Sequence, residues 1–253
     1  MTNIEYSFLI TTFAGLSTMI GAILIFFKAK STDRVVCSSL AFAAGVMIMV
    51  SITDLIPSAI SGFLNMYYLI PAILFTLIFL VLGIVISTLI NKYIPDISSG
   101  DISNKGLFKV GIISMIAIIL HNIPEGIATF MTSTKDISLG LSLALAITLH
   151  NIPEGISISV PIYYSTKSKF KSLLYTFVSG ISELMGAVIA YLFLAPYMNN
   201  FVMSILMSLI AGIMVSISIY ELIPASLKYK RVGDTVKFFL IGVIFMGLCH
   251  ILM

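Results

Sequence analysis

Long apolar segments, separated only by short polar stretches, are the feature that most constrains this chain. Eight of them lie near residues 6–27, 35–60, 67–90, 108–131, 138–163, 172–195, 199–227 and 235–252. A membrane-spanning helix needs about 20 apolar residues, whereas a transmembrane barrel would show alternating apolar and polar residues in segments of about ten. The sequence therefore predicts an all-α integral membrane protein with eight transmembrane helices, folded as one domain over residues 1–253.

Composition excludes several other classes of protein. Charged residues make up 10% of the chain and hydrophobic residues 59%, whereas soluble domains have about 25% and about 45–50%. The net charge of +3 gives no basic surface for nucleic acid, so we expect a lipid bilayer and no nucleic-acid partner. Cys37 and Cys249 form no CxxC, which argues against a disulfide framework or a thiolate metal site. Residues 1–5 contain no Lys or Arg, so we expect the first apolar segment to be its own insertion signal.

The basic residues predict the orientation in the membrane. Thirteen of the 14 Lys and Arg residues lie in alternate loops, and only Lys135 lies on the other side. The thirteen are Lys28, Lys30, Arg34, Lys92, Lys105, Lys109, Lys167, Lys169, Lys171, Lys228, Lys230, Arg231 and Lys237. Because cytoplasmic loops are enriched in Lys and Arg, we expect these loops in the cytoplasm, both termini outside, and a multi-pass protein of the cell membrane.

Two sequence motifs each occur twice, in segments that are expected to cross the membrane in opposite directions. The pattern Ala-Gly-x-Met, Ser, then Asp/Glu-Leu-Ile-Pro occupies residues 44–57 and recurs 167 positions later, at 211–224. The hexapeptide His-Asn-Ile-Pro-Glu-Gly occupies residues 121–126 and recurs 29 positions later, at 150–155. Inverted repeats with a binding site near the bilayer midplane are typical of secondary transporters. We therefore expect inverted repeats here.

Five acidic residues lie inside the apolar segments: Asp54, Glu125, Glu154, Glu183 and Glu221. No Lys or Arg accompanies them in the segment interiors. A carboxylate at the bilayer centre costs about 2.5–3.5 kcal/mol on insertion scales. Protonation, water or a bound cation must therefore compensate for them, and a neutral structural carboxylic acid is the simplest alternative to a binding site.

The hexapeptide has the spacing of a ligand set. His121 and Glu125 are four residues apart and share a helix face, with Asn122 at its edge. Pro124 and Pro153 lack the N–H that the carbonyls of Leu120 and Leu149 would accept from, so each is expected to kink its helix. The following glycines, Gly126 and Gly155, permit close helix packing.

These residues predict a site for zinc or another first-row divalent ion, because imidazole nitrogen with carboxylate and amide oxygen suits such ions. Seven candidates lie at similar depth near the midplane: His121, Asn122, Glu125, His150, Asn151, Glu154 and Glu183. They exceed one tetrahedral shell, which favours two metal ions bridged by Glu125 and Glu154. Because such ligands also bind protons, metal affinity should fall in acid.

Four more residues are candidates for the route of the ion. Asp54 and Glu221 occupy matching repeat positions at opposite depths, as expected of an entrance and an exit ligand, although each could be a carboxylate that reaches water from a helix end. Met47 and Met214 lie seven residues earlier on the same helix faces, where methionine serves either packing or metal binding. His250 has no acidic neighbour at helical spacing, so we expect a structural role for it.

The chain resembles the ZIP family (Zrt/Irt-like proteins), and within it the bacterial ZupT type. The two His-Asn-x-Pro-Glu-Gly motifs, the Ser-Gly-x-x-Glu of residues 179–183 and the Ala-Gly-x-Met repeats carry the resemblance. It implies uptake of divalent cations through a fold of three, two and three helices that is often dimeric. It also places the seven residues in a binuclear centre and adds Met47 as a ligand. Many relatives have a His-rich loop where residues 91–107 contain none, so we expect a plain cytoplasmic connector here.

Two other functions use the same residues. An intramembrane metalloprotease requires His-Glu-x-x-His, with the first Glu as general base, but Asn follows each His here and no base remains outside the ligand set. A proton relay would use the acids but has no need of paired His and Asn. The chain has no phosphate-binding motif of an ATP-driven pump. We therefore expect a transporter rather than an enzyme, with no resident cofactor. Its expected substrate is chiefly zinc, with Fe²⁺, Mn²⁺, Co²⁺ and Cd²⁺ as alternatives that the same ligands accept.

Overall fold

The structure is a computed structural model that describes residues 2–27, 31–93, 102–194 and 199–252. Lys28, Lys30 and most of the predicted connector, including Pro95, Asp96, Gly100 and Asp101, lie outside the described residues. Within those residues every regular element is helical, so the predicted all-α class is confirmed.

The helices follow the apolar segments closely. In chain order they are α1 (Asn3–Leu16), α2 (Thr18–Gly21), the 3₁₀ turn η1 (Ala22–Phe26), α3 (Thr32–Val50), the π-helical turn η2 (Ser51–Leu55), α4 (Ile56–Leu64), α5 (Leu69–Tyr93), α6 (Ile102–Lys135), α7 (Ile137–Thr166), α8 (Lys169–Ile189), the π-helical turn η3 (Ala190–Leu194), α9 (Asn200–Ile217), the π-helical turn η4 (Ser218–Leu222), α10 (Ile223–Leu227) and α11 (Val232–Leu252). Seven described helical stretches are long and apolar enough to cross a membrane. The structure thus supports a multi-pass membrane protein.

The first apolar segment supplies none of these seven stretches. It is divided at Ser17, whose hydroxyl donates to the carbonyl of Ala14 at 2.6 Å, and Thr18 donates in the same way to Gly15. A Cβ on Gly15 would overlap the carbonyl oxygen of Gly180 in α8, and one on Gly21 would overlap that of Ile152 in α7. The pieces of this segment are therefore fitted closely against two other helices.

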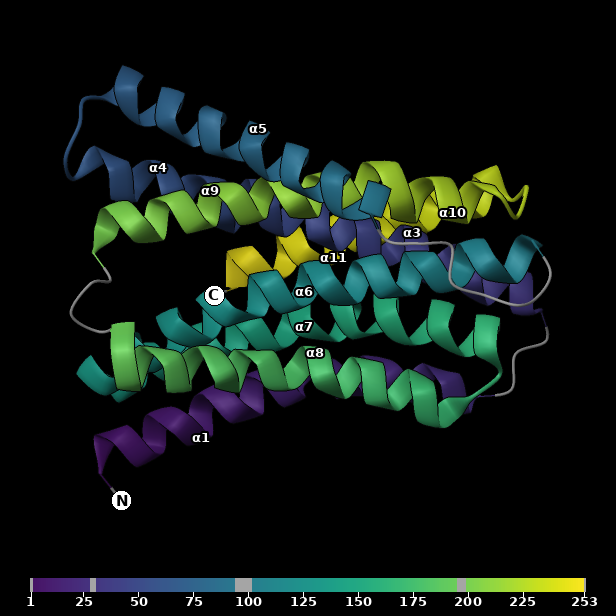
Figure 1. The fold of residues 1–253 in the computed structure, drawn as a ribbon, viewed down its shortest axis with the longest axis horizontal. Coiled ribbons are helices and arrows are strands. Elements are labelled where there is room, and N and C mark those ends of the chain that lie inside the picture. Colours follow the sequence, from purple (N-terminus) through teal and green to yellow (C-terminus); the bar gives the residue numbers. More distant parts are fainter. Residues whose placement is uncertain (1, 28–30, 94–101, 195–198, 253) are drawn as a thin grey trace.

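The helices form two groups, which occupy the lower and upper halves of Figure 1. The first group contains α1, α2, α6, α7 and α8, and the second contains α3, α4, α5, α9, α10 and α11. Between them lies the largest apolar core cluster, to which α3 and α9 of the second group and α6 and α7 of the first contribute. Leu40, Met47, Ile113, Val160 and Met214 are among its buried members.

The helix ends in Figure 1 separate into two sets. The ends that flank the Lys- and Arg-rich loops lie on the right: the ends of η1, α5, α7 and α10 and the starts of α3, α6, α8 and α11. Both chain termini and the turn between α4 and α5 lie toward the left. The helix ends that flank the basic loops are thus gathered at one end of the molecule, opposite the termini.

Both π-helical turns that carry a repeated acid precede a proline. The amide of Ile56 donates to the carbonyl of Ser51, and that of Ile223 to Ser218, five residues back instead of four. Pro57 and Pro224 come next and cannot donate, so the wide turn brings the chain into the following helix without a clash. Asp54 and Glu221 therefore lie at equivalent positions in two equivalent turns.

Candidate metal centre

Two histidines and two glutamates meet in the interior of the first helix group. The His121 and Glu125 side chains lie one above the other on α6, with Nε2 and Oε1 3.1 Å apart. His150 of α7 approaches the same Glu125 Oε1 at 3.1 Å, and His121 Nε2 lies 3.5 Å from Glu154 Oε1. The hexapeptide spacing therefore places both copies in one cluster.

The cluster is buried, and its charges are paired only within it. His121, Glu125, His150 and Glu154 are each at most 6% exposed. The ion pairs described for the two carboxylates are with histidine alone. Carboxylates so far from water need either protons or a bound cation. The arrangement is therefore one that a divalent ion would stabilise.

The two histidines could supply nitrogen ligands to a metal ion. One ligand atom each from His121, His150 and Glu154 lie within 4.8 Å of one another, all three buried. Zinc binds imidazole nitrogen and carboxylate oxygen at about 2.0–2.2 Å, so three atoms at this spacing can surround one ion after small side-chain movements. Glu125, in contact with both histidines, can complete that shell.

The two asparagines could supply oxygen ligands. The Asn122 amide nitrogen donates to the carbonyl of Ser179 at 3.1 Å. The Asn151 amide nitrogen donates to the carbonyl of Ala14 at 2.9 Å and to Glu183 Oε2 at 3.0 Å. These bonds leave the Oδ1 atoms of both asparagines without a partner among the described residues. Each amide is thus held by its nitrogen, and its oxygen remains available to a cation.

Most of the unpartnered buried atoms in the described chain belong to this cluster. Besides the asparagine oxygens they include Nδ1 of His121, Oε2 of Glu125, Oε2 of Glu154 and Oε1 of Glu183. A buried polar atom without a partner costs about 1–3 kcal/mol. That so many gather in one place is typical of a site that fills with an ion.

Two glycines bring Glu183 into this cluster. A Cβ on Gly126 of α6 would overlap the backbone carbonyl oxygen of Glu183, and a Cβ on Gly15 of α1 would lie 3.2 Å from its Oε2. Only glycine lets three helix backbones come so close. The side chain of Glu183 is fully buried and in hydrogen-bond contact with Asn151, so all seven predicted ligands come from neighbouring positions on α6, α7 and α8.

The structure places the two methionines elsewhere. Met47 of α3 and Met214 of α9 are fully buried in the apolar cluster between the helix groups. Their thioethers therefore pack against aliphatic side chains of both groups, and a metal-binding role for either remains a prediction.

The two repeated acids have equivalent partners. Asp54 Oδ1 lies 3.0 Å from Nδ1 of His250 on α11, and both side chains are partly exposed. Glu221 accepts a short hydrogen bond from the side-chain amide of Asn91 on α5. His250 and Asn91 follow from no helical spacing in the sequence, because each partner lies on another helix. His250 has no acidic neighbour at helical spacing on its own helix, and its acidic partner comes instead from the turn that carries Asp54.

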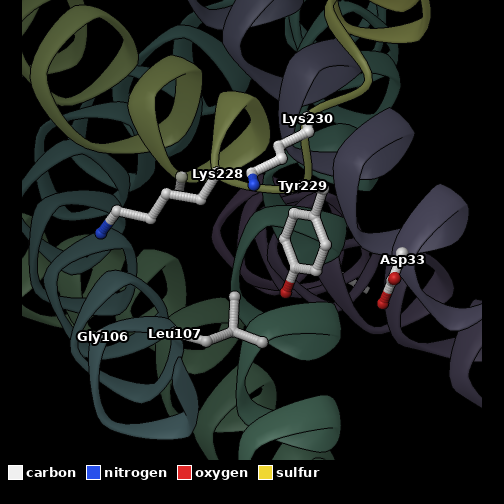
Figure 2. Close-up of a pocket in the computed structure, with 7 residues that line it drawn as sticks. Asp33, Gly106, Leu107, Lys228, Tyr229 and Lys230 are labelled. Carbon is white, nitrogen blue, oxygen red and sulfur yellow. The ribbon is translucent and has the colours of Figure 1, made fainter. Parts of the chain in front are cut away.

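A cavity of about 430 Å³ opens between the two helix groups at the end that carries the basic loops. Figure 2 shows Tyr229 between Leu107 of α6 and Asp33 of α3, with Lys228 and Lys230 on the turn after α10. Burial, followed by the nearby Asp33 charge, raises the pKa of the Tyr229 hydroxyl, which stays protonated at neutral pH. The positive charges of the two lysines make this cavity an unfavourable binding site for a divalent cation.

Comparison with known proteins gives a consistent result. The family model described as ZIP Zinc transporter matches residues 98–250. The chain is 38% identical to a zinc transporter ZupT of Clostridium perfringens, over 100% of this chain and 97% of that protein. It is 39% identical to one of Campylobacter jejuni, over 97% and 96%, and 42% identical to one of Streptococcus mutans, over 89% of each.

Proposed function

Because this chain belongs to the ZIP zinc transporter family, we propose that it carries zinc and related divalent cations across the cell membrane into the cytoplasm. The buried meeting of His121, Glu125, His150 and Glu154 is the observation that carries this proposal. Imidazole with carboxylate selects zinc and its first-row neighbours over Mg²⁺ and Ca²⁺, which prefer oxygen alone.

The ligand assignment is part of the proposal. His121, His150 and Glu154 would hold one ion on the nitrogen side, and Asn122, Asn151 and Glu183 a second on the oxygen side. Glu125 and Glu154 would bridge the two ions, since the carboxylate of Glu125 contacts both histidines. Asp54 and Glu221 would serve as entrance and exit ligands, and Met47 would border the nitrogen side. These assignments rest on spacing, burial and unpartnered atoms.

An inverted repeat in the second helix group is also proposed. The packing of α3 on α11 matches that of α9 on α5: a Cβ on Gly45 would overlap the carbonyl of Phe239, and one on Gly212 that of Leu80. The pairs Asp54–His250 and Glu221–Asn91 have the same relation. In each case the positions on α3 or η2 differ from their counterparts on α9 or η4 by 167 residues. The positions on α11 and α5 differ by 159 residues, as a repeated unit requires.

The two helix groups suggest how access alternates. All seven ligands belong to the first group, whereas the surface it meets on the second is largely aliphatic. A shift of the first group along the second would expose the ions first outside and then inside. With the basic loops in the cytoplasm, such a shift would deliver the ions inward. The family resemblance also implies a homodimer. In such a dimer the first helix group would shift along the second separately in each copy.

The enzyme alternative is not favoured. A metalloprotease would need a base beside the metal in addition to the ligands. The residues after the two histidines are amides whose nitrogens donate to the carbonyls of Ser179 and Ala14. They are held in place as neutral groups and cannot remove a proton from water.

Zinc flux into proteoliposomes tests the proposal. Purified protein is reconstituted into vesicles that contain a fluorescent zinc chelator, and zinc or Mg²⁺ is added outside. We expect saturable zinc influx above that of protein-free vesicles and no comparable Mg²⁺ influx. A folded, reconstituted protein that moves no divalent ion would contradict the proposal.

A further inference from the structure

A basic pocket lies at the end of the molecule that carries the Lys-rich loops, away from the metal centre. Its volume is about 400 Å³, and η1, α3, α7 and the start of α8 form its walls. Two lysines, Lys167 and Lys169, lie on it, and none of its described lining residues is acidic. Its electrostatic character is thus that of an anion site, unlike the cavity of Figure 2, which includes Asp33.

Aromatic side chains surround the two lysines. The Lys169 ammonium lies 4.6 Å from the ring centroid of Phe26, and that of Lys167 lies 5.2 Å from the ring of Tyr164. Tyr163 packs edge-on against Tyr164. Tyrosine rings concentrate where a membrane meets water, and basic pockets between transmembrane helices on the cytoplasmic side suit lipid head groups.

The outer rim of the pocket is apolar and exposed. Phe26 is 50% exposed and the adjacent Phe27 69% exposed. Hydrophobic rings so placed beside lysines would lie at the boundary between acyl chains and head groups. A small soluble anion would use the lysines but not these rings, whereas a phospholipid would contact both.

The backbone of Lys167 gives an independent observation. This residue ends α7 in the left-handed conformation, with φ of 55°, where glycine is the usual residue. A lysine in this conformation costs some conformational energy relative to glycine. The only interaction described for its ammonium group is the contact with the Tyr164 ring, which leaves its three N–H donors available to a ligand.

From these observations we propose that the pocket binds the head group of an anionic phospholipid of the inner leaflet. The phosphate would lie between Lys167 and Lys169, and the acyl chains would extend along Phe26 and Phe27. Thr32 of α3 lines the same pocket, so the bound lipid would touch both helix groups. The inference requires the proposed orientation in the membrane but not zinc transport.

Spin-labelled lipids test this binding directly. The full-length protein is reconstituted in phosphatidylcholine vesicles with trace spin-labelled phosphatidylglycerol or phosphatidylcholine, and the motionally restricted fraction of each is measured. We expect phosphatidylglycerol to be preferred. The double variant Lys167→Gln, Lys169→Gln should lose roughly fivefold of that preference per lysine. Equal restriction of the two lipids by wild type, or an unchanged preference in the double variant, would overturn the proposal.

Two single substitutions separate lipid binding from backbone stability. Lys167→Gly should unfold at the same or a higher temperature than wild type, because it relieves the left-handed backbone, yet lose lipid preference. Lys230→Gly is its matched control, since Lys230 has the same φ of 55° but lines the cavity of Figure 2. This control variant should retain the preference for phosphatidylglycerol. If millimolar inorganic phosphate displaced the phosphatidylglycerol, the pocket would be a site for soluble anions, and the lipid proposal would be wrong.

Discussion

At the scale of single residues, hydrogen bonds hold the amide nitrogens of the two asparagines and leave their oxygens available to a metal. Asn122 and Asn151 look interchangeable in sequence, but their nitrogens are held differently. Asn122 donates to one backbone carbonyl, whereas Asn151 donates to a carbonyl of α1 and to the carboxylate of Glu183. Asn151 therefore orients Glu183, which is also a proposed ligand, and leaves its own oxygen without a partner among the described residues.

The substitution Asn151→Leu tests that double role. It keeps the number and branching of the side-chain heavy atoms but removes the amide, so Glu183 loses the donor that orients it. Loss of a group that orients a metal ligand typically weakens metal binding 10–100-fold, and we expect a loss of this size in zinc affinity, measured by chelator competition. Asn65→Leu, in the exposed turn after α4, is the control and should bind zinc as wild type does. Equal affinity of the two variants would contradict this role.

Acidity should also act at the residue scale. Zinc binds imidazole nitrogen that carries no proton and carboxylate that is ionised. Lowering the pH therefore favours the protonated, metal-free centre. The zinc concentration for half-maximal flux is expected to rise between about pH 7.5 and about pH 5.5, the range in which histidine usually titrates. A half-maximal concentration that does not change over this range would argue against histidine ligands.

The sequence predicted which residues meet in the buried cluster better than it predicted the contacts around it. Ligands on one helix share a face at spacings of three and four, so His121 with Glu125 follows from the chain alone. The Asp54–His250 and Glu221–Asn91 contacts join residues 196 and 130 positions apart. No local pattern reports such pairs, because the packing of α3 on α11 and of α9 on α5 creates them.

At the scale of helices, glycine contacts position the ligands. Gly126 in α6 faces the backbone of Glu183 in α8, and Gly186 in α8 faces that of Ile123 in α6. These reciprocal contacts fix the separation of the two helices. Because Glu183 lies at the contact itself, a change in the separation is also a change in the metal centre.

Gly126→Ala tests this coupling between packing and binding. A methyl group here overlaps the Glu183 carbonyl, so α6 and α8 must separate. We expect a loss of about 1–3 kcal/mol in the free energy of unfolding, together with weaker zinc binding. Gly233→Ala is the matched control, since a Cβ there meets nothing within 4 Å. If the Gly126→Ala variant were as stable as that control and bound zinc as tightly, close packing of α6 on α8 would be unnecessary for zinc binding.

The helix boundaries show where sequence patterns end. Apolar run length located the long helices, but it did not predict the break at Ser17 or the π-helical turns at Ser51–Leu55 and Ser218–Leu222. Hydrophobicity does not distinguish α, 3₁₀ and π geometry, since all three bury similar side chains. The prolines at 57 and 224 were visible in the sequence, yet the wide turn before each depends on tertiary packing.

At the scale of the whole molecule, the distribution of Lys and Arg predicts sidedness. The flanks of the basic loops gather at one end of Figure 1, opposite both termini. The alternation of Lys and Arg in the sequence and the positions of the helix ends thus distinguish the same two ends of the molecule. Which end faces the cytoplasm follows from the positive-inside rule.

Thiol labelling of cells tests the sidedness. In a background of Cys37→Ser and Cys249→Ser, a cysteine is introduced as Asn65→Cys, in the turn between α4 and α5, or as Lys228→Cys, after α10. An impermeant maleimide applied outside intact cells should label the first variant and should reach the second only after permeabilisation. The opposite pattern would reverse the orientation and with it the proposed direction of transport.

The central claim is that ions cross the membrane through the buried centre on α6, α7 and α8. Its most direct test is zinc flux into proteoliposomes by the double variant Glu125→Ala, Glu154→Ala, with Asp33→Ala as a control for removal of an acid elsewhere. The account predicts saturable flux in wild type and control and none in the double variant at equal reconstituted amounts of folded protein. Undiminished flux in the double variant would contradict it.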